Sequence, residues 1–304
     1  MFALRDSTLS VHILNVGDGD SIVVELPEER GERAHLVVDC YRAQKTNDYL
    51  QNLESSRLRL VVATHPHYDH IAGLQKVLQN SQGRVDQFWD SGFRHNSKAW
   101  IDLVNYVSAN PDILFLRPSS GLALRMAGVE ITVLAPSVYL KNRYETYGVN
   151  INNASIVLKL AYGSPSQNSI ILTADAQWDS WSKMTEEFPH LEKTSNPFQR
   201  IQVQKGFLPL KCEAMKVAHH GSKHGTALEG IERLRPRVAV ISCGNPSRHS
   251  FPSPLATGAL QVLNTRILHT SKGSVVLSLE DDGKFDYFQH PDTEIQTPKA
   301  PPRV

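Results

Sequence analysis

The sequence is short of cysteine, of long apolar runs and of net charge. Its three cysteines lie far apart and form no C-x-x-C pair, which argues against a disulfide framework or a cysteine-type structural zinc. No stretch approaches the roughly 20 apolar residues that span a bilayer, so we expect no membrane partner. The formal net charge of +1 gives no global field that draws the chain to nucleic acid. Binding of nucleic acid would therefore require a local basic patch.

The first residues also lack a long apolar core followed by a small-residue cleavage site, which are the features of a secretory signal. Together with the scarce cysteines, this favours a reducing, cytoplasmic location. A chain of 304 residues is long enough for one large domain or two small ones. We expect one domain over residues 1–290 and a Pro-rich, unpacked tail over residues 291–304.

Apolar, β-branched runs alternate with helical patterns along the chain. Residues 9–16 and 21–26 predict a hairpin around a glycine turn, and residues 58–64 predict a buried strand followed by a helix. Strand-rich regions at both ends with helices between them predict an α/β fold, in which two sheets are sandwiched by helices. The stretches 137–153 and 190–209 are expected to be loops.

Histidines and carboxylates gather where predicted strands end, and the strongest such motif is THPHYDH at residues 64–70. Side chains two apart on an extended segment point the same way, so His65 and His67 can converge on one metal ion. The chain then turns into a helix, where Asp69 and His70 are presented together to a second, adjacent ion. The alternative, incidental loop histidines with Asp69 as a helix N-cap, leaves four ligand-type residues within six positions unexplained.

Two later strand ends supply what such a two-metal site still needs. Residues 170–175 end an apolar strand in Asp175, whose carboxylate can give one oxygen to each ion; a helix N-cap is the alternative role. Residues 215–222 end a further strand in His219 and His220. Adjacent side chains on an extended backbone point to opposite sides, so only one should be a ligand. We favour His219 as the ligand and His220 as a pocket residue, and the reverse assignment stays open.

The order of the segments VGDGDS, VVDC, THPHYDHIAG, NNASIVLKL, ILTADA, KVAHHGSKHGT, VAVISCG and RHSFPSP resembles the metallo-β-lactamase superfamily. It is most similar to the branch that contains the ComEC-type hydrolase domains and the phosphorylcholine esterases. The resemblance extends over about residues 9–280. It implies a four-layer αβ/βα sandwich, with two mixed sheets flanked by helices and a dinuclear metal site at the sheet edges.

The resemblance also implies a set of ligands. The first ion would be held by His65 and His67, and the second by Asp69, His70 and His219, with Asp175 bridging both. Asp39 would lie behind the site and orient a ligand histidine. Many superfamily members carry one more ligand histidine before the bridging aspartate, but here the only histidine in that interval, His95, comes well before the expected strand. The first ion is thus expected to have three protein ligands. Two divalent ions are expected, with zinc favoured and manganese or iron as alternatives.

Other residues are weaker candidates for the same pocket. His249 matches a histidine that the branch places at the pocket mouth, and a surface loop histidine is the alternative. Asn153 is expected near the site, with a plain turn as an equal alternative. Lys216, Lys223 and His224 could meet an anionic group, although the last two could equally belong to a solvated loop.

A site of this kind has a defined chemistry. Two cations that share a water lower its pKa from about 15.7 towards about 7, so that hydroxide exists at neutral pH. Asp69 would belong to the catalytic centre, and His220 or His249 would protonate a leaving group or steady an oxyanion. The sequence therefore predicts a metal-dependent hydrolase, most favourably of a phosphodiester in nucleic acid or in a small molecule. Two alternatives remain: a hydrolase of carboxylic esters, thioesters or lactones, and a metal-binding sensor or partner-binding module without turnover.

Overall fold

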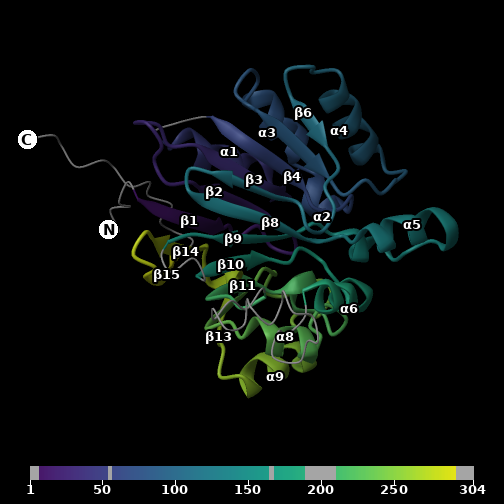
Figure 1. Cartoon of the computed structure of the whole chain (residues 1–304), viewed down its shortest axis with the longest axis vertical. Helices are drawn as coiled ribbons and strands as arrows, with labels where there is room; N and C mark the ends of the chain where they lie inside the picture. Colours follow the sequence, from purple (N-terminus) through teal and green to yellow (C-terminus); the bar gives the residue numbers. More distant parts are fainter. Residues whose placement is uncertain (1–6, 54–56, 164–167, 189–209, 292–304) are drawn as a thin grey trace, which may run out of the picture.

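The structure is a computed structural model, and it describes residues 7–53, 57–163, 168–188 and 210–291. Two β-sheets form its centre, one of eight strands and one of seven. Helices cover the outer face of each sheet (Figure 1). The expected four-layer α/β sandwich is thereby confirmed. The loop expected at residues 190–209 and the tail after residue 291 lie outside the described residues.

The eight-stranded sheet has the order β15-β14-β1-β2-β3-β4-β5-β6. Its strands are β1 (Thr8–Ile13), β2 (Ser21–Glu25), β3 (His35–Cys40), β4 (Leu58–Ala63), β5 (Gln87–Asp90), β6 (Leu114–Leu116), β14 (Val275–Glu280) and β15 (Phe285–Gln289). β1 pairs antiparallel with both β2 and β14, so segments from the two ends of the described chain meet in this sheet. β3, β4, β5 and β6 are parallel neighbours.

The seven-stranded sheet has the order β13-β12-β11-β10-β9-β8-β7. Its strands are β7 (Ala123–Met126), β8 (Val129–Ala135), β9 (Val157–Ala161), β10 (Ser169–Leu172), β11 (Ala214–Lys216), β12 (Val238–Ile241) and β13 (Arg266–His269). β10 to β13 run parallel. In open α/β sheets, ligands bind beyond the carboxyl ends of such parallel strands, so both sheets offer an edge for a site.

Helices of the first sheet are α1 (Ala43–Gln51), α2 (Tyr68–Ile71), α3 (Leu74–Asn80) and α4 (Lys98–Ser108), and those of the second half are α5 (Val138–Tyr147), α6 (Trp178–Glu187), α8 (Leu228–Leu234) and α9 (Pro254–Val262). The described residues also form three short 3₁₀ helices, η1 (Ile151–Ala154), η3 (Ala218–Gly221) and η4 (Thr270–Lys272). No helix in the described part of the chain combines the length and the apolar character that a membrane crossing requires.

The expected loop at residues 137–153 is wrong, because α5 and η1 occupy most of it. The sequence of α5, VYLKNRYETY, has no apolar stripe at helical spacing, so its periodicity gave no signal. β7 was also not predicted. It is an edge strand of only four residues, in which Leu124 and Met126 turn inward and Ala123 and Arg125 outward, and so short an alternation gives little signal in the sequence.

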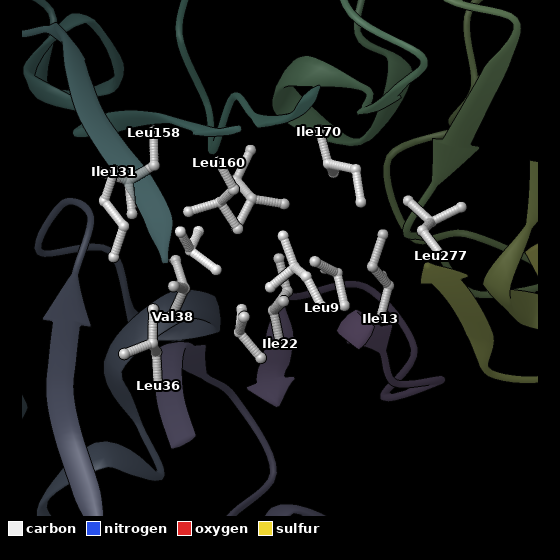
Figure 2. Packing of buried hydrophobic residues seen from close by; sticks show 14 of the residues in the cluster. Leu9, Ile13, Ile22, Leu36, Val38, Ile131, Leu158, Leu160, Ile170 and Leu277 are labelled. Atoms are coloured by element: carbon white, nitrogen blue, oxygen red, sulfur yellow. The ribbon is translucent and has the colours of Figure 1, made fainter. Parts of the chain in front are cut away.

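The main core lies between the two sheets, where apolar side chains of both pack against each other (Figure 2). β3 shows how this core is built. Leu36 and Val38 face the second sheet, whereas Val37 and Cys40 face the helices on the other side. A strand buried on both faces reads as a continuous apolar run, which is why the sequence predicted these strands well. Truncating a core residue such as Leu60 to alanine should cost about 2–5 kcal/mol.

Candidate metal centre

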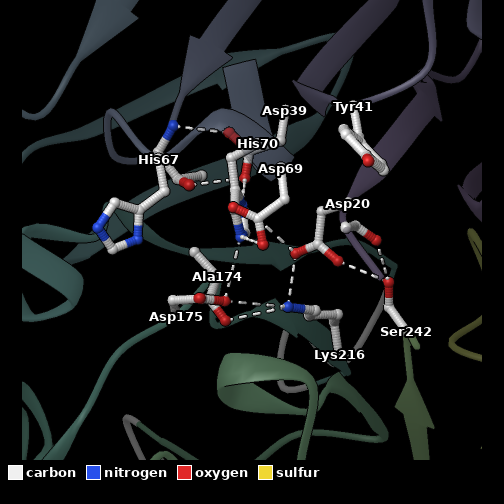
Figure 3. A network of polar contacts seen from close by, with 12 residues as sticks. Asp20, Asp39, Tyr41, His67, Asp69, His70, Ala174, Asp175, Lys216 and Ser242 are labelled. Carbon is white, nitrogen blue, oxygen red and sulfur yellow. Dashed lines mark hydrogen bonds and ion pairs between the residues drawn. The ribbon is translucent and has the colours of Figure 1, made fainter. Parts of the chain in front are cut away.

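The predicted ligand segments meet where the carboxyl ends of strands from both sheets come together. Figure 3 shows His67, Asp69, His70 and Asp175 of these segments close together. The THPHYDH segment follows β4, Asp175 follows β10, and η3 with His219 and His220 follows β11. Parallel pairing of β10 with β11 brings the last two segments side by side. The segment before β9 is tied to the first motif, since the Ile156 N–H donates to the Thr64 carbonyl at 2.9 Å. The site thus spans the junction of the two sheets.

The first ligand group consists of His65, His67 and Asp175, whose ligand atoms lie within 4.8 Å of one another. His65 Nε2 is 3.1 Å from His67 Nδ1 and 3.8 Å from Asp175 Oδ2. His65 and Asp175 are buried, whereas His67 is partly exposed. Burial lowers the pKa of His65 well below its usual value, so its imidazole is neutral, the form that binds a metal ion.

The second group consists of Asp69, His70 and His220, again with ligand atoms within 4.8 Å. Asp175 lies between the two groups. Its Oδ1 is 3.2 Å from His70 Nε2 and 3.5 Å from His220 Nε2, while its Oδ2 faces His65. Burial alone would raise the pKa of Asp175, but His70 and His220 hold that pKa well below its usual value. The carboxylate is therefore charged and offers one oxygen to each group.

The expected choice of His219 as ligand of the second ion needs correction. The structure groups His220 with Asp69 and His70, whereas His219 is partly exposed and its Nε2 lies 3.6 Å from Asp175 Oδ2, on the side of the first group. The premise of an extended backbone fails here. Both histidines adopt left-handed φ angles, 49° and 53°, so neighbouring side chains do not simply alternate.

Hydrogen bonds behind the site orient both imidazoles of the second group. His70 Nδ1 lies 2.6 Å from Asp39 Oδ2, and His220 Nδ1 lies 2.6 Å from the Ser242 carbonyl oxygen. Asp39 is itself fixed by Thr64, whose N–H and hydroxyl donate to its two oxygens at 2.8 and 2.6 Å. With Nδ1–H donated backwards, each ring directs Nε2 into the site. Asp39 therefore lies where the sequence analysis expected it, behind a candidate ligand histidine.

The donor set fits divalent metal ions. Three buried atoms, His70 Nε2, His220 Nε2 and Asp175 Oδ1, have no hydrogen-bond partner within the described residues, although they converge. Buried polar atoms are normally satisfied, and an unsatisfied one points to a strained site or a bound species. Imidazole and carboxylate ligands suit zinc, manganese and iron.

A buried ion pair beneath the site was missed by the sequence analysis. Lys216, at the end of β11, is fully buried, and its Nζ lies 2.5 Å from Asp20 Oδ2 and 3.8 Å from Asp175 Oδ1. Burial lowers the pKa of Lys216, but Asp20 and Asp175 outweigh this and raise it, so the ammonium stays charged. Lys216 is thus not available to an anionic substrate, contrary to expectation. A lysine inside an apolar strand was the available signal.

His95 also lies closer to the site than its sequence position suggested. Its ring centroid is 6.1 Å from that of His67, although it comes from the segment between β5 and α4. Ser97 holds the ring, because its N–H donates to His95 Nδ1 at 3.3 Å and its hydroxyl oxygen lies 2.9 Å from the same atom. The sequence analysis did not count His95 among the ligands of the first ion, and no candidate metal group within the described residues includes it.

Asn153 caps a helix and does not face the ligand groups. Its Oδ1 accepts from the N–H groups of Gln177 and Ser180, both at 3.1 Å, and so holds the start of α6. Its link to the site is indirect, since Gln177 Nε2 lies 2.8 Å from His219 Nδ1. Asn153 was expected near the site, and the contact that the structure gives it there runs through Gln177. Lys223 and His224 follow η3 as exposed residues, which leaves both expected roles open.

An aromatic residue connects the site to its rim on the second-sheet side. The ring centroid of Phe251 lies 5.6 Å from that of His219 and 6.3 Å from that of His220. His249 is exposed, with its ring 5.5 Å from Phe251. Asp18 fixes this segment, because its two carboxylate oxygens accept from the N–H groups of Gly244 at 2.8 Å and Arg248 at 2.7 Å. Neither Phe251 nor the role of Asp18 was predicted.

Comparisons with known proteins bear on the family and the fold. Residues 14–109 match the family model described as the metallo-beta-lactamase superfamily. ComE operon protein 3 of Bacillus subtilis (strain 168) is 23% identical to the chain over 285 residues, which are 88% of this chain and 32% of that protein. The chain thus spans about a third of the length of this curated relative.

Solved structures share the fold at low identity. The metallo-beta-lactamase fold protein YhfI from Bacillus subtilis superposes with a TM-score of 0.51 and 13% identity, covering 86% of this chain and 96% of that chain. Igni18, a metallo hydrolase from the archaeon Ignicoccus hospitalis, gives a TM-score of 0.48 and 14% identity, covering 93% of this chain and 99% of that chain. The likeness to YhfI is a likeness of fold.

Proposed function

We propose that this chain, which carries a domain of the metallo-beta-lactamase superfamily, is a metal-dependent hydrolase that cleaves phosphodiesters. The observation that carries the proposal is the position of Asp175, whose Oδ2 faces His65 while its Oδ1 faces His70. A carboxylate between two ligand groups can hold two ions close together. We assign His65, His67 and Asp175 to one ion, and Asp69, His70, His220 and Asp175 to the other, with zinc as the favoured ion.

Divalent cations in these two groups would lower the pKa of a water molecule and offset the negative charge that develops on the phosphoryl oxygens. The protein residues orient the reactants. Burial raises the pKa of Asp69, but His220 and His70 outweigh this effect and bring the pKa below its usual value. Asp69 therefore stays a carboxylate. It can therefore accept a hydrogen bond from the attacking water. We assign protonation of the leaving oxygen to His249, which is exposed and whose ring lies 5.5 Å from that of Phe251.

Charge on the rim supports an anionic substrate. Three exposed cations lie in segments next to the ligand groups: Arg42, Lys223 and Arg248. Lys223 follows η3, the Arg42 N–H donates to Ser21 Oγ, and the Arg248 N–H donates to Asp18. Cations around a site raise the local concentration of an anion and speed its encounter. A phosphodiester carries one negative charge at the reacting group and further charges along a nucleic-acid strand, so it suits this rim better than a neutral ester does.

We also propose that residues 1–290 form the hydrolase domain. Antiparallel pairing of β1 with β14, and of β14 with β15, supports this boundary, because strands from both ends of the described chain complete the first sheet. Loss of β1 would separate β14 from β2 inside the sheet, and loss of β15 would leave β14 as the edge strand.

A second candidate function is hydrolysis of a carboxylic ester, thioester or lactone by the same groups. Phe251 favours it, because its ring lies against His219 and His220 and could contact an apolar acyl group. Both functions use the same ligands, so only substrates distinguish them.

The test is turnover of bis-(p-nitrophenyl) phosphate by protein supplied with zinc or manganese, compared with a panel of p-nitrophenyl carboxylic esters and lactones. Asp175→Asn should lower phosphodiesterase kcat/KM by at least ~100-fold, because it removes a charged oxygen from both groups. Asp86→Asn is the matched control, since Asp86 pairs with Arg57 and Arg59 on the surface.

Phosphodiester turnover that needs added metal ion and Asp175, but not Asp86, supports the proposal. Turnover of the acyl panel alone would replace it with the second candidate. Tightly bound metal ion without turnover of any substrate would favour a sensor or partner-binding module instead.

A further inference from the structure

An exposed aromatic side chain stands within the metal-ligand motif itself. Tyr68 lies between His67 of the first group and Asp69 of the second, and its side chain is 65% exposed. An exposed tyrosine is often only a surface residue. Tyr68, however, contacts a second aromatic ring at the edge of the site.

Tyr41 and Arg42 extend this surface from the end of β3. The ring centroids of Tyr41 and Tyr68 lie 6.2 Å apart in an edge-to-face arrangement. The guanidinium carbon of Arg42 lies 4.3 Å from the Tyr41 ring centroid, a cation–π contact. We call Tyr41, Arg42 and Tyr68 the aromatic ledge.

The aromatic ledge is fixed to the metal centre by backbone contacts. The Tyr41 N–H donates to the Asp20 carbonyl at 2.8 Å, and the Asp20 N–H donates to the Asp69 carbonyl at 3.1 Å. The Tyr41 ring also covers Gly19, where an added Cβ would lie 2.5 Å from a ring carbon. Glycine at this position thus lets the ring lie down beside Asp20, which Figure 3 shows next to Tyr41. The ledge is therefore built on the same segments that support the ligands.

The chemistry of the aromatic ledge suits one kind of partner. Proteins that bind single-stranded nucleic acid stack its bases on aromatic rings and contact its phosphates with arginine or lysine. Arg42 is exposed and forms no ion pair with a carboxylate among the described residues, so its charge is available to an anion. In a duplex the bases are already stacked on each other, so a single strand fits this surface better.

We propose that the aromatic ledge stacks a nucleobase next to the phosphodiester that occupies the metal centre, so that the substrate is a single-stranded nucleic acid. This inference rests on the proposed phosphodiesterase function. Tyr68 provides the exposed ring, Tyr41 supports it, and Arg42 contacts a neighbouring phosphate.

The experiment compares two single-stranded oligonucleotides with the same backbone, one with bases and one with abasic sites in their place. Tyr68→Ala should lower kcat/KM on the strand with bases by about 5- to 100-fold and leave the abasic strand unchanged. Tyr68→Phe keeps the ring and should match the unmodified protein. Arg42→Gln should lower kcat/KM on both strands by the same factor, because Arg42 contacts the phosphates and both strands have the same backbone. Tyr287→Ala, on edge strand β15, is the matched control for loss of an exposed tyrosine.

Metal content is measured for every variant, and wild-type content in Tyr68→Ala shows that its neighbours still bind. An equal loss on both strands, or no loss on either, overturns the inference. Binding of the labelled strands to Asp175→Asn, with and without Tyr68→Ala, separates the two proposals. Base-dependent binding without hydrolysis by the unmodified protein would keep the aromatic ledge and reject the phosphodiesterase; hydrolysis without base dependence would do the reverse.

Discussion

Among the described residues, two buried clusters combine histidine with carboxylate, and only one of them has the geometry of a metal site. The first is the candidate metal centre, which we call the metal centre. The second, the His12 cluster, consists of His12, Glu25, His35 and Tyr49, under α1 on the outer face of the first sheet. Here His12 Nε2 lies 2.7 Å from Glu25 Oε1, and the Tyr49 hydroxyl lies 2.8 Å from His12 Nδ1 and 3.0 Å from Glu25 Oε1.

The difference lies in where the residues sit on their strands. His12, Glu25 and His35 come from three adjacent strands and share one face. Neighbouring strands are about 4.8 Å apart, so side chains across three strands spread rather than converge. At the metal centre the residues follow the strand ends, where turns bend them inwards. Within the described residues, all sets of three ligand atoms that lie within 4.8 Å of one another are at the metal centre. Composition alone does not make a metal site.

The largest effect is expected from removing the buried positive charge of Lys216 beneath the metal centre. Lys216→Met should lower the free energy of unfolding by about 3–5 kcal/mol in chelator, because it leaves Asp20 buried without its cation. Added divalent ion should restore part of this loss, since Asp20 lies in a candidate ligand group with His70 and Asp175. The measurement is denaturant unfolding with and without metal ion.

Tyr49→Phe in the His12 cluster is the comparison for Lys216→Met. It removes one buried hydroxyl and should cost about 1 kcal/mol, equally with and without metal ion. If added metal ion raised the free energy of unfolding of both variants by the same amount, the distinction between the two clusters would be wrong.

The next effect is a loss of stability in acid that comes from the His12 cluster. Burial lowers the pKa of His35 from 6.5 to about 4. As the pH falls from 6.5 to about 4, the unfolded chain takes up a proton at His35 and the folded chain does not. The folded state should therefore lose about 3 kcal/mol over this range. His35→Gln should flatten the dependence of the unfolding free energy on pH by that amount, and an unchanged slope would refute the assignment.

Glu25 acts in the same direction at lower pH. Burial raises its pKa, but His12 and His35 outweigh this and bring the pKa from 4.5 down to about 2. Stability contributed by Glu25 is present above pH 4.5 and is lost as the pH falls through about 2. His224→Gln, at an exposed histidine, is the control for both measurements and should follow the unmodified protein.

A smaller effect distinguishes the two adjacent histidines of η3. His220→Ala should remove one of two bound metal ions and lower kcat by about 100-fold, since His220 Nε2 faces both Asp69 and Asp175. His219→Ala should keep both ions and mainly raise KM, because His219 lies at the partly exposed side of the site. Metal content by elemental analysis and steady-state kinetics check both. Loss of an ion in His219→Ala instead would restore the original assignment.

These residues also mark how far sequence reasoning reaches. The THPHYDH motif is local, so strand and helix geometry were enough to group His65 with His67 and Asp69 with His70. The choice between His219 and His220 depends on left-handed backbone angles that residue pattern does not reveal. Lys216, at the end of β11, pairs with Asp20, which precedes β2 of the other sheet. His95 lies near His67, although 27 residues separate them in the sequence. Such contacts depend on tertiary packing, which a single sequence does not specify.

The smallest effect concerns His95, a histidine beside the metal centre but outside its ligand groups. The Ser97 N–H donates to Nδ1, so the neutral ring carries its proton on Nε2 and has no lone pair there for a metal ion. The expected role is hydrogen-bond donation to a bound anion. His95→Ala should keep the metal content and raise KM by about 10-fold, whereas His95→Gln, which places an amide N–H near the same position, should recover most of the loss.

His269→Ala provides the matched control for His95→Ala, because His269 is also partly exposed but lies on edge strand β13. It should change neither metal content nor KM. Loss of bound metal ion in His95→Ala would contradict the tautomer that Ser97 imposes and would make His95 the additional ligand of the first ion. The boundary between the metal centre and its surroundings would then lie one histidine further out than the ligand distances indicate.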